Sequence, residues 1–341
     1  MLLFSMQRAT QLLLVVPGLA HIYEPHWADR LRVPALQKML ARARKTHLAG
    51  LSLEGWFCDM FDLETNSTCP IAAFSFLGEG GQPGDAYWLR ADPIHLRIYR
   101  DQIILLDSEA LTLDLREIEQ FIATLNAHFA IEGLGFYAPT PHRWYVKLPR
   151  AVDLTTYPLH EVTGKNISDY LPKGKDQSHW RRVFNEVQML FFEHTVNQER
   201  EARGELPVNS VWFWGGGAIP VPKSLFASLY SNNAFIKGVA LSTGMTLQET
   251  PETMMNCLSQ LRTRGNYLIM LENLATPARH GDVAAWRAAL LTMEEQWFQP
   301  LMQALQQKRL QTVSLHAFAN SQHDEFNLRR GDLWKFWRRP V

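Results

Sequence analysis

The sequence predicts an α/β protein in which a mainly parallel sheet, flanked by helices, is interrupted by an inserted α+β domain. The first observation is that short apolar runs alternate with helical patterns near both ends of the chain, an order that favours parallel strands. The second is a change from Ala86 to about residue 150, where short alternating runs are separated by turns. The 341 residues, 46% of them hydrophobic, suffice for one large or two modest domains.

The first strand is predicted in LLLVVPGLA, residues 12–20, and an amphipathic helix follows over 33–45. This apolar run is too short to cross a bilayer and contains Pro17. A signal peptide is the alternative, because Arg8 precedes the run and small residues follow it. The strand is favoured because the next segment has the pattern of a crossover helix. A second apolar run at 71–78 ends in the glycine-rich GEGGQPGD, which marks a domain boundary.

The later elements fall into two groups. In the insert, a helical pattern covers 114–129, and GFYAPTPHRWYVKL indicates strand and turn. Beyond it, IKGVALS and NYLIML are predicted strands around a helix at about 250–264. A long amphipathic helix and a last strand, TVSLHAF, then complete the sheet. These elements assign 1–84 and 205–341 to the core, and 85–204 to the inserted domain with its connecting helix.

The charge balance excludes some classes of partner. Lys+Arg and Asp+Glu both number 34, so the chain has no strong nucleic-acid signal and no general attraction to an anionic membrane. No segment has the length and composition of a membrane span. Cys58, Cys69 and Cys257 form no CxxC pair and are predicted to be free thiols of a reducing compartment. We therefore expect a soluble, cytoplasmic protein.

Two groups of residues could indicate a phosphate-binding loop or a metal site, but their spacing does not match the known motifs. The glycines at 215–217 fit neither GxxxxGK[ST] nor GxGxxG, so WFWGGG is predicted to be a core strand that ends in a tight turn. His280, His316 and His323 lack the spacing of HExxH or of a structural zinc site. Whether these histidines form a rearranged metal set stays open at this point.

The C-terminal segment RRGDLWKFWRR combines basic and aromatic residues. One interpretation is a tail that docks on phosphate, on a membrane surface or on a protein partner. The other, which is the commoner outcome, is that Trp334 and Trp337 pin the chain end to the core while the arginines stay in water.

Two longer segments, PLHEVTGKNISDYLPKG and HTVNQEREARGELPVNSVWFWGGG, resemble those of the archaeal-type cofactor-independent phosphoglycerate mutases. CPIAAFSFLGEG and ENLATPARHGD are similar to further segments of that family, in the same order along the chain. The resemblance runs from about residue 12 to 320. It is still closer to the bacterial RpfE-type regulatory proteins, which share the C-terminal tryptophans and arginines. It implies a cytoplasmic protein with an alkaline-phosphatase-like core, in which WFWGGG is where the chain re-enters the core sheet.

In the active mutases, a serine nucleophile and two divalent cations, held by Asp and His, move a phosphoryl group. At the matching positions this chain keeps Glu272, places Cys69 where the nucleophile falls, and has His316 and, in a looser match, His323. The other matched positions carry residues of a different kind: Pro17, Pro70, Ala275, Arg279 and Leu315. Because proline, alanine and leucine cannot ligate a cation, the resemblance implies a protein without a metal cofactor.

The leading hypothesis is therefore a degenerate, non-catalytic mutase-like protein with a regulatory or metabolite-binding role. Its candidate ligands for a phosphorylated or carboxylated small molecule are four cations: Lys173, Arg200, Arg203 and Arg279. The alternative is an active, metal-independent or atypical phosphotransferase or phosphatase that uses Cys69 as the nucleophile. No CxxxxxR pattern supports that alternative, because Ser75 stands six residues after Cys69.

Overall fold

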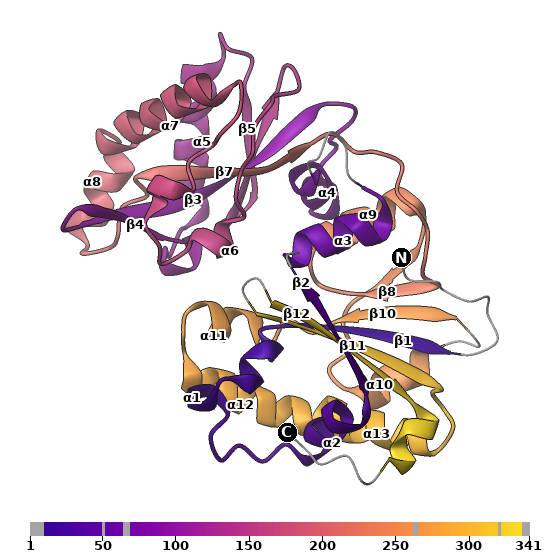
Figure 1. Cartoon of the computed structure of the whole chain (residues 1–341). Helices are drawn as coiled ribbons and strands as arrows, with labels where there is room; N and C mark the ends of the chain where they lie inside the picture. Colours follow the sequence, from indigo (N-terminus) through magenta and orange to yellow (C-terminus); the bar gives the residue numbers. More distant parts are fainter. Residues whose placement is uncertain (1–9, 50–51, 64–68, 262–264, 320–321, 336–341) are drawn as a thin grey trace. The chain divides into compact units, whose positions relative to one another are not determined.

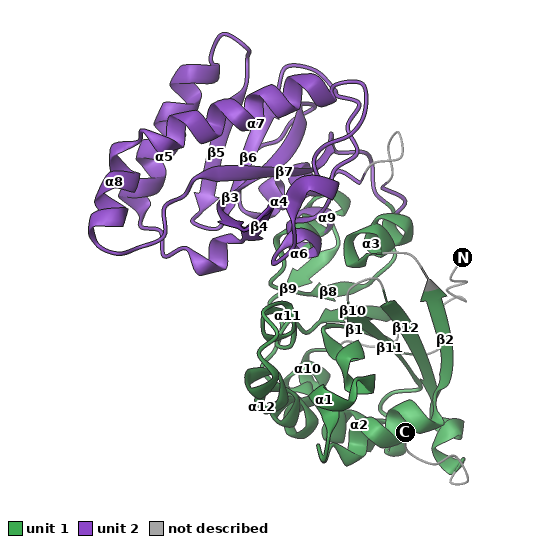
Figure 2. Cartoon of the chain, turned by 60° about the vertical axis from the view of Figure 1, so that its left-hand side comes forward, with its two compact units in different colours: residues 1–61, 223–236, 240–341 green, residues 62–222, 237–239 purple. Residues whose placement is uncertain are grey.

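The computed structural model describes residues 10–49, 52–63, 69–261, 265–319 and 322–335. The chain divides into two compact units, each with its own sheet (Figure 2). Unit 1 comprises residues 1–61, 223–236 and 240–341, and unit 2 comprises 62–222 and 237–239.

Unit 1 contains a seven-stranded sheet in the order β2-β12-β11-β1-β10-β8-β9 (Figure 1). Its neighbours are parallel from β11 across to β9, whereas β12 is antiparallel to both β11 and β2. The strands span Gln11–Pro17 (β1), Arg44–Ala49 (β2), Ser228–Tyr230 (β8), Thr246–Gln248 (β9), Asn266–Met270 (β10), Thr312–Ala319 (β11) and Gln322–Arg329 (β12). The predicted α/β class with a mainly parallel sheet is confirmed.

Helices cover both faces of this sheet. On one face, alternate residues of β1 such as Leu12 and Leu14 join a large apolar cluster with α2, α12 and α13. On the other face, Trp56 of α3 packs on side chains of β11 and β12. The helical elements of this part of the chain are η1 (Leu19–Tyr23), α1 (Pro25–Ala28), α2 (Pro34–Arg42), α3 (Leu53–Phe61), α9 (Ala234–Thr243), α10 (Met254–Gln260), α11 (Ala275–Arg279), α12 (Val283–Met293), the π-helical turn η4 (Glu294–Phe298), α13 (Gln299–Gln306) and η5 (Arg330–Trp334).

Unit 2 is built on a five-stranded antiparallel sheet, in which β4-β3-β6-β5 are neighbours and β7 pairs with β3. Its strands span Tyr87–Tyr99 (β3), Gln102–Leu106 (β4), Gly135–Thr140 (β5), Arg143–Leu148 (β6) and Ser210–Gly217 (β7). Its helical elements are α4 (Ile71–Gly78), η2 (Ser108–Ala110), α5 (Leu115–Phe129), α6 (Leu159–Val162), η3 (Ile167–Asp169), α7 (Gln177–Phe192) and α8 (Thr195–Ala202). Helix α5 begins at a capping box formed by Asp114 and Glu117.

The WFWGGG strand, β7, belongs to unit 2, so the prediction that it re-enters the core sheet was wrong. It pairs with β3, and the Trp214 indole donates a hydrogen bond to the buried carboxylate of Asp92 at 2.7 Å. The glycine at 217 permits a close approach, because a Cβ there would lie 2.5 Å from Pro70 Cβ. Unit 2 is therefore wider than the predicted insert 85–204, since it includes β7 and α4.

Some of the predicted helices and strands are confirmed, whereas others differ from the structure in type or in their bounds. The strand at the N-terminus is β1, which lies in the middle of the sheet. The helix predicted over 33–45 ends at Arg42, because the chain enters β2 at Arg44. IKGVALS is not a strand but lies in α9, whose first turn is capped by the Asn233 side chain. TVSLHAF lies in β11 and is not the last strand, because β12 follows it.

Two of the three cysteines differ from the prediction. Cys58 and Cys69 are disulfide-bonded, whereas Cys257 is a free, buried thiol whose pKa burial raises to about 12. The N-cap of α4 is Pro70, the residue after Cys69. The argument from free thiols to a reducing compartment therefore no longer holds. Among the described residues, no helix has the length and apolar character needed to cross a membrane.

The disulfide gives a direct test by thiol titration. Denatured without reductant, the protein should react with Ellman's reagent at one thiol, Cys257, and after reduction at all three cysteines. Three reactive thiols before reduction, in protein purified without reductant, would contradict this arrangement.

Candidate functional site

The carboxyl edge of the parallel strands in unit 1 is where folds of this kind place their sites. Because β1 pairs in register with both β10 and β11, Gly18, Leu271 and Phe318 lie close to this edge. Gly18 has a left-handed φ of 84°, and a Cβ there would lie 2.6 Å from the Leu274 carbonyl oxygen. The Gly18 N–H also donates to the Phe318 carbonyl at 2.7 Å. The loops at this edge are therefore tightly packed.

A small pocket of about 340 Å³ follows the ends of β8, β9 and β10. Its polar lining side chains include Asn232, Thr250, Glu252, Glu272 and Asn273. Asn233, beside it, donates a hydrogen bond to Glu272 at 3.0 Å. The described lining contains two carboxylates and no lysine, arginine or histidine, so its charge is unfavourable for a phosphate group. It suits a cationic or hydroxyl-rich ligand better.

Two of the three histidines considered in the sequence, His316 on β11 and His323 on β12, lie next to each other. Phe318 is paired with His323 and His316 with Glu325, so these side chains share one face of the sheet. The Trp56 ring of α3 covers them, with centroid distances of 4.6 Å to His316 and 5.3 Å to His323. Both histidines are fully buried.

The imidazole rings of His316 and His323 belong to one continuous series of hydrogen bonds. His316 Nδ1 lies 2.8 Å from His323 Nε2, and His316 Nε2 lies 3.1 Å from the Ser314 hydroxyl oxygen. That hydroxyl donates to Glu325 at 3.0 Å, so His316 Nε2 must donate to it. His316 Nδ1 is then an acceptor for the Nε2–H of His323. The network thus assigns one neutral tautomer to each ring.

Burial keeps both rings uncharged. It lowers the pKa of His316 to about 3, with a further contribution from His323. It lowers the pKa of His323 to about 4, although the nearby Asp324 carboxylate acts in the opposite direction. Asp324 itself is paired with Lys45 and with His47, each at 2.9 Å. At neutral pH the pair therefore holds no positive charge that could receive an anion.

The residues present do not fit the two-metal centre that the resemblance implies for active mutases. Leu315 is buried in the apolar cluster on the opposite face of the sheet, and both ring nitrogens of His316 are hydrogen-bonded. His280 is exposed after α11 and does not join the other two histidines. In the described ranges, no group of three or more His, Cys, Asp or Glu side chains is arranged to hold a metal ion.

The predicted ligand cations have different surroundings. Arg200 is only 1% exposed, and its guanidinium donates to Glu117 at 2.7 Å and to the Thr112 carbonyl at 2.8 Å. Arg203 donates to the same carboxylate at 2.6 Å and to Glu205 at 2.9 Å. This ion-pair network joins α8 to α5, which gives Arg200 and Arg203 a structural role.

Lys173 and Arg279 do not join that network. Lys173 is exposed, its backbone pairs with Thr155, and its ammonium lies 6.0 Å from the centre of the Tyr157 ring. Arg279 ends α11 in unit 1, where it is exposed. Only Arg200 and Arg203 are thus brought together, and ligand contact by any of the four stays a prediction.

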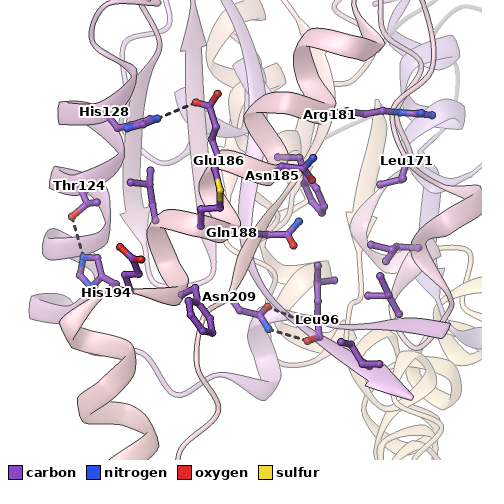
Figure 3. Close-up of a pocket in the computed structure, with 18 of the residues that line it drawn as sticks. Leu96, Thr124, His128, Leu171, Arg181, Asn185, Glu186, Gln188, His194 and Asn209 are labelled. Atoms are coloured by element: carbon purple, nitrogen blue, oxygen red, sulfur yellow. Dashed lines mark hydrogen bonds and ion pairs between the residues drawn. The ribbon is translucent and has the colours of Figure 1, made fainter. Parts of the chain in front are cut away.

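Unit 2 contains a larger groove of about 1170 Å³, which was not predicted from the sequence. Figure 3 shows hydrogen bonds on its wall between Thr124 and His194 and between His128 and Glu186. Aliphatic side chains of β3 and β4 also line it, together with Phe192 of α7, which is 84% exposed. The sequence signal was MLFF at 189–192, which has more apolar residues than one buried helix face requires.

Two solved structures have a fold similar to that of this chain. No protein-family profile matches the chain. A solved cofactor-independent phosphoglycerate mutase from Thermoplasma acidophilum superposes with a TM-score of 0.50 at 13% identity, covering 95% of this chain and 90% of that one. The PH0037 protein from Pyrococcus horikoshii superposes with a TM-score of 0.57 at 12% identity, covering 95% and 88%. The chain therefore shares the α/β fold of these two solved structures.

Part of the chain is also similar in sequence to phosphoglycerate mutases. The 2,3-bisphosphoglycerate-independent phosphoglycerate mutase of Methanosarcina acetivorans is 29% identical over 236 residues, which cover 64% of this chain and 58% of that protein. A probable mutase of the same type from Geobacter sulfurreducens is 25% identical over 177 residues, covering 52% and 44%. The matches thus span about half the length of these relatives. Over the matched part, the chain is homologous to these mutases.

The buried histidine pair should make stability depend on pH in a defined window. Because their pKa values are lowered in the folded state, the unfolded chain gains protons first as the pH falls below about 6.5. The free energy of unfolding should therefore decrease from about pH 6.5 to about pH 4, by up to about 1.4 kcal/mol per pH unit for each histidine.

The matched variants are His316→Phe, which removes one buried imidazole, and His142→Gln, which changes an exposed one. In urea unfolding, the stability difference between wild type and His316→Phe should shrink as the pH falls from 7 to 4. Curves for His142→Gln should run parallel to wild type. Parallel curves for His316→Phe as well would show that its ring titrates normally.

Proposed function

We propose that this chain is a phosphoglycerate mutase-like protein that has lost two-metal phosphoryl transfer and acts as a regulatory or metabolite-binding protein. The observation that carries the proposal is the hydrogen bond between His316 and His323 beneath Trp56. A metal ligand must present a free nitrogen lone pair to the ion. In this arrangement, His316 uses both nitrogens within the protein, whereas the buried Nδ1 of His323 has no hydrogen-bond partner, so the pair leaves one nitrogen lone pair and not two.

The charge at the same edge of the sheet supports the proposal. Phosphoryl transfer needs cations that neutralise the phosphoryl oxygens in the transition state. The pocket beside β10 instead carries Glu252 and Glu272. The histidine pair is neutral near pH 7. Neither feature supplies positive charge from its own side chains, so the reaction would require bound metal ions, and the described residues contain no group of three or more His, Cys, Asp or Glu side chains arranged to hold one.

The alternative, a metal-independent phosphotransferase, would need a reactive Cys69 thiolate. In the disulfide-bonded protein that sulfur is not available as a nucleophile. The helix that follows is apolar and largely buried, from Ile71 to Phe76, and supplies no arginine to receive phosphate oxygens. The alternative therefore depends on prior reduction of the protein.

A regulatory role like that of the RpfE-type proteins is part of this proposal, as is a cytoplasmic location. The mutase activity of the homologues belongs to longer proteins, of which this chain matches about half. The absence of that activity is therefore the first point to test.

The test is metal content by mass spectrometry together with mutase and p-nitrophenyl phosphatase assays in Mn²⁺, with and without reductant. We expect substoichiometric metal and no turnover in either condition, with an active mutase assayed in parallel as the control. About two bound metals and turnover that His316→Ala abolishes would contradict the proposal. Turnover only after reduction, lost in Cys69→Ser, would favour the cysteine alternative.

A further inference from the structure

A second cavity lies at the opposite edge of the unit 1 sheet, where the parallel strands begin. The strand pairing aligns Gln11 with Asn266 and with Thr312, and continues from Thr312 to Arg329. Arg44, the first residue of β2, pairs with Asn327 at the same edge. The cavity at this amino edge has a volume of about 990 Å³. It is therefore separate from the carboxyl edge, where the candidate active site of the fold lies.

The charged lining of this cavity is strongly unbalanced. Among the described lining residues, five are cationic and one is acidic: Arg44, Lys308, Arg329, Arg330 and Lys335 against Asp332. The Asp332 carboxylate is already paired with Lys335 at 2.5 Å and accepts the backbone N–H of Arg329 at 2.8 Å. Because the whole chain has a net charge of zero, this is a local concentration of positive charge.

Three of these cations are exposed and form no ion pair with a carboxylate of the described residues: Arg44, Lys308 and Arg330. Positive side chains gathered without counter-charges repel one another. An anionic ligand would offset that repulsion, and guanidinium groups bind phosphate through paired hydrogen bonds.

The basic segment at the C-terminal side is held in place by the fold. Arg330 donates its backbone N–H to Gln311 at 3.2 Å, and Arg42 donates to the Leu333 carbonyl. Leu333 packs against the apolar cluster of unit 1, whereas Trp334 is 74% exposed. The interpretation that tryptophan pins this end was wrong for Trp334, and Trp337 lies outside the described residues. Leu333 and these backbone contacts thus hold the backbone of the C-terminal basic segment against unit 1.

The backbone conformation of Lys308 also supports a role for this cavity in binding an anion. It stands in the turn between α13 and β11 with a left-handed φ of 67°, a conformation in which glycine is strongly preferred. A lysine in this conformation carries backbone strain that a glycine would not. The lysine provides an ammonium group beside the cavity, which a glycine at this position would not provide.

We infer that this cavity binds a soluble organic ligand with two or more phosphate groups. The cations receive the phosphates, while neutral groups such as Thr46, Thr312 and Asn327 offer hydrogen bonds to the remainder of the ligand. The volume is that of a small-molecule site and is far larger than one phosphate requires. This inference is independent of whether the carboxyl edge is catalytic.

The test is calorimetric titration of the full chain with tripolyphosphate and with orthophosphate at low salt. Tripolyphosphate should bind at least tenfold more tightly than orthophosphate, and its affinity should fall as salt is added. Lys308→Gly and Arg330→Gln should each weaken binding about tenfold, as expected for one lost charge-assisted contact. Lys308→Gly relieves the left-handed strain, so an unchanged or higher melting temperature would show that its loss of binding is not caused by unfolding.

Arg32→Gln is the matched control, because Arg32 is exposed in the same unit and does not line the cavity. It should change the affinity less than twofold. Absence of tripolyphosphate binding, or equal losses in Arg32→Gln, would overturn the inference. Binding to phosphatidylserine vesicles, lost in the same two variants and without tripolyphosphate binding, would instead assign this surface to membranes. None of these outcomes depends on the metal and turnover assays.

Discussion

The hydrogen bond between the rings of His316 and His323 determines what the carboxyl edge of unit 1 can do. It can form because β12 is antiparallel to β11 and places His323 on the same face as His316, where Trp56 excludes water. In that dry environment a neutral, paired imidazole is favoured over a charged or exposed one. Both nitrogens of His316 and the Nε2 of His323 are thus engaged within the protein, and only the buried Nδ1 of His323 has no hydrogen-bond partner.

The two edges of one sheet consequently have opposite chemical character. The carboxyl edge has a small pocket with two carboxylates and a neutral histidine pair, which disfavour phosphate. The amino edge gathers five cations around a larger cavity. Positive charge for an anionic ligand is therefore found away from the site that the homology would indicate. If both proposals hold, the chain would bind a phosphorylated ligand at the amino edge without carrying out phosphoryl transfer at the carboxyl edge.

Much of the fold could be predicted because buried parallel strands such as β1 and β10 are continuous apolar runs. Strand β12 was missed because its buried residues include His323 and Glu325, which have no apolar signal. The disulfide has no local spacing pattern. The basic cavity could not be predicted either, because strand register brings together residues as distant as Arg44 and Lys308. The tail predicted to dock contributes to it through Arg330.

The most direct test of this account is NMR of the histidine side-chain nitrogens during titration with Mn²⁺. We predict that His316 and His323 keep their neutral tautomers at neutral pH and show no selective paramagnetic broadening at stoichiometric Mn²⁺. Selective broadening of these two signals would show that a metal binds at the pair, and the account of a lost two-metal centre would be wrong.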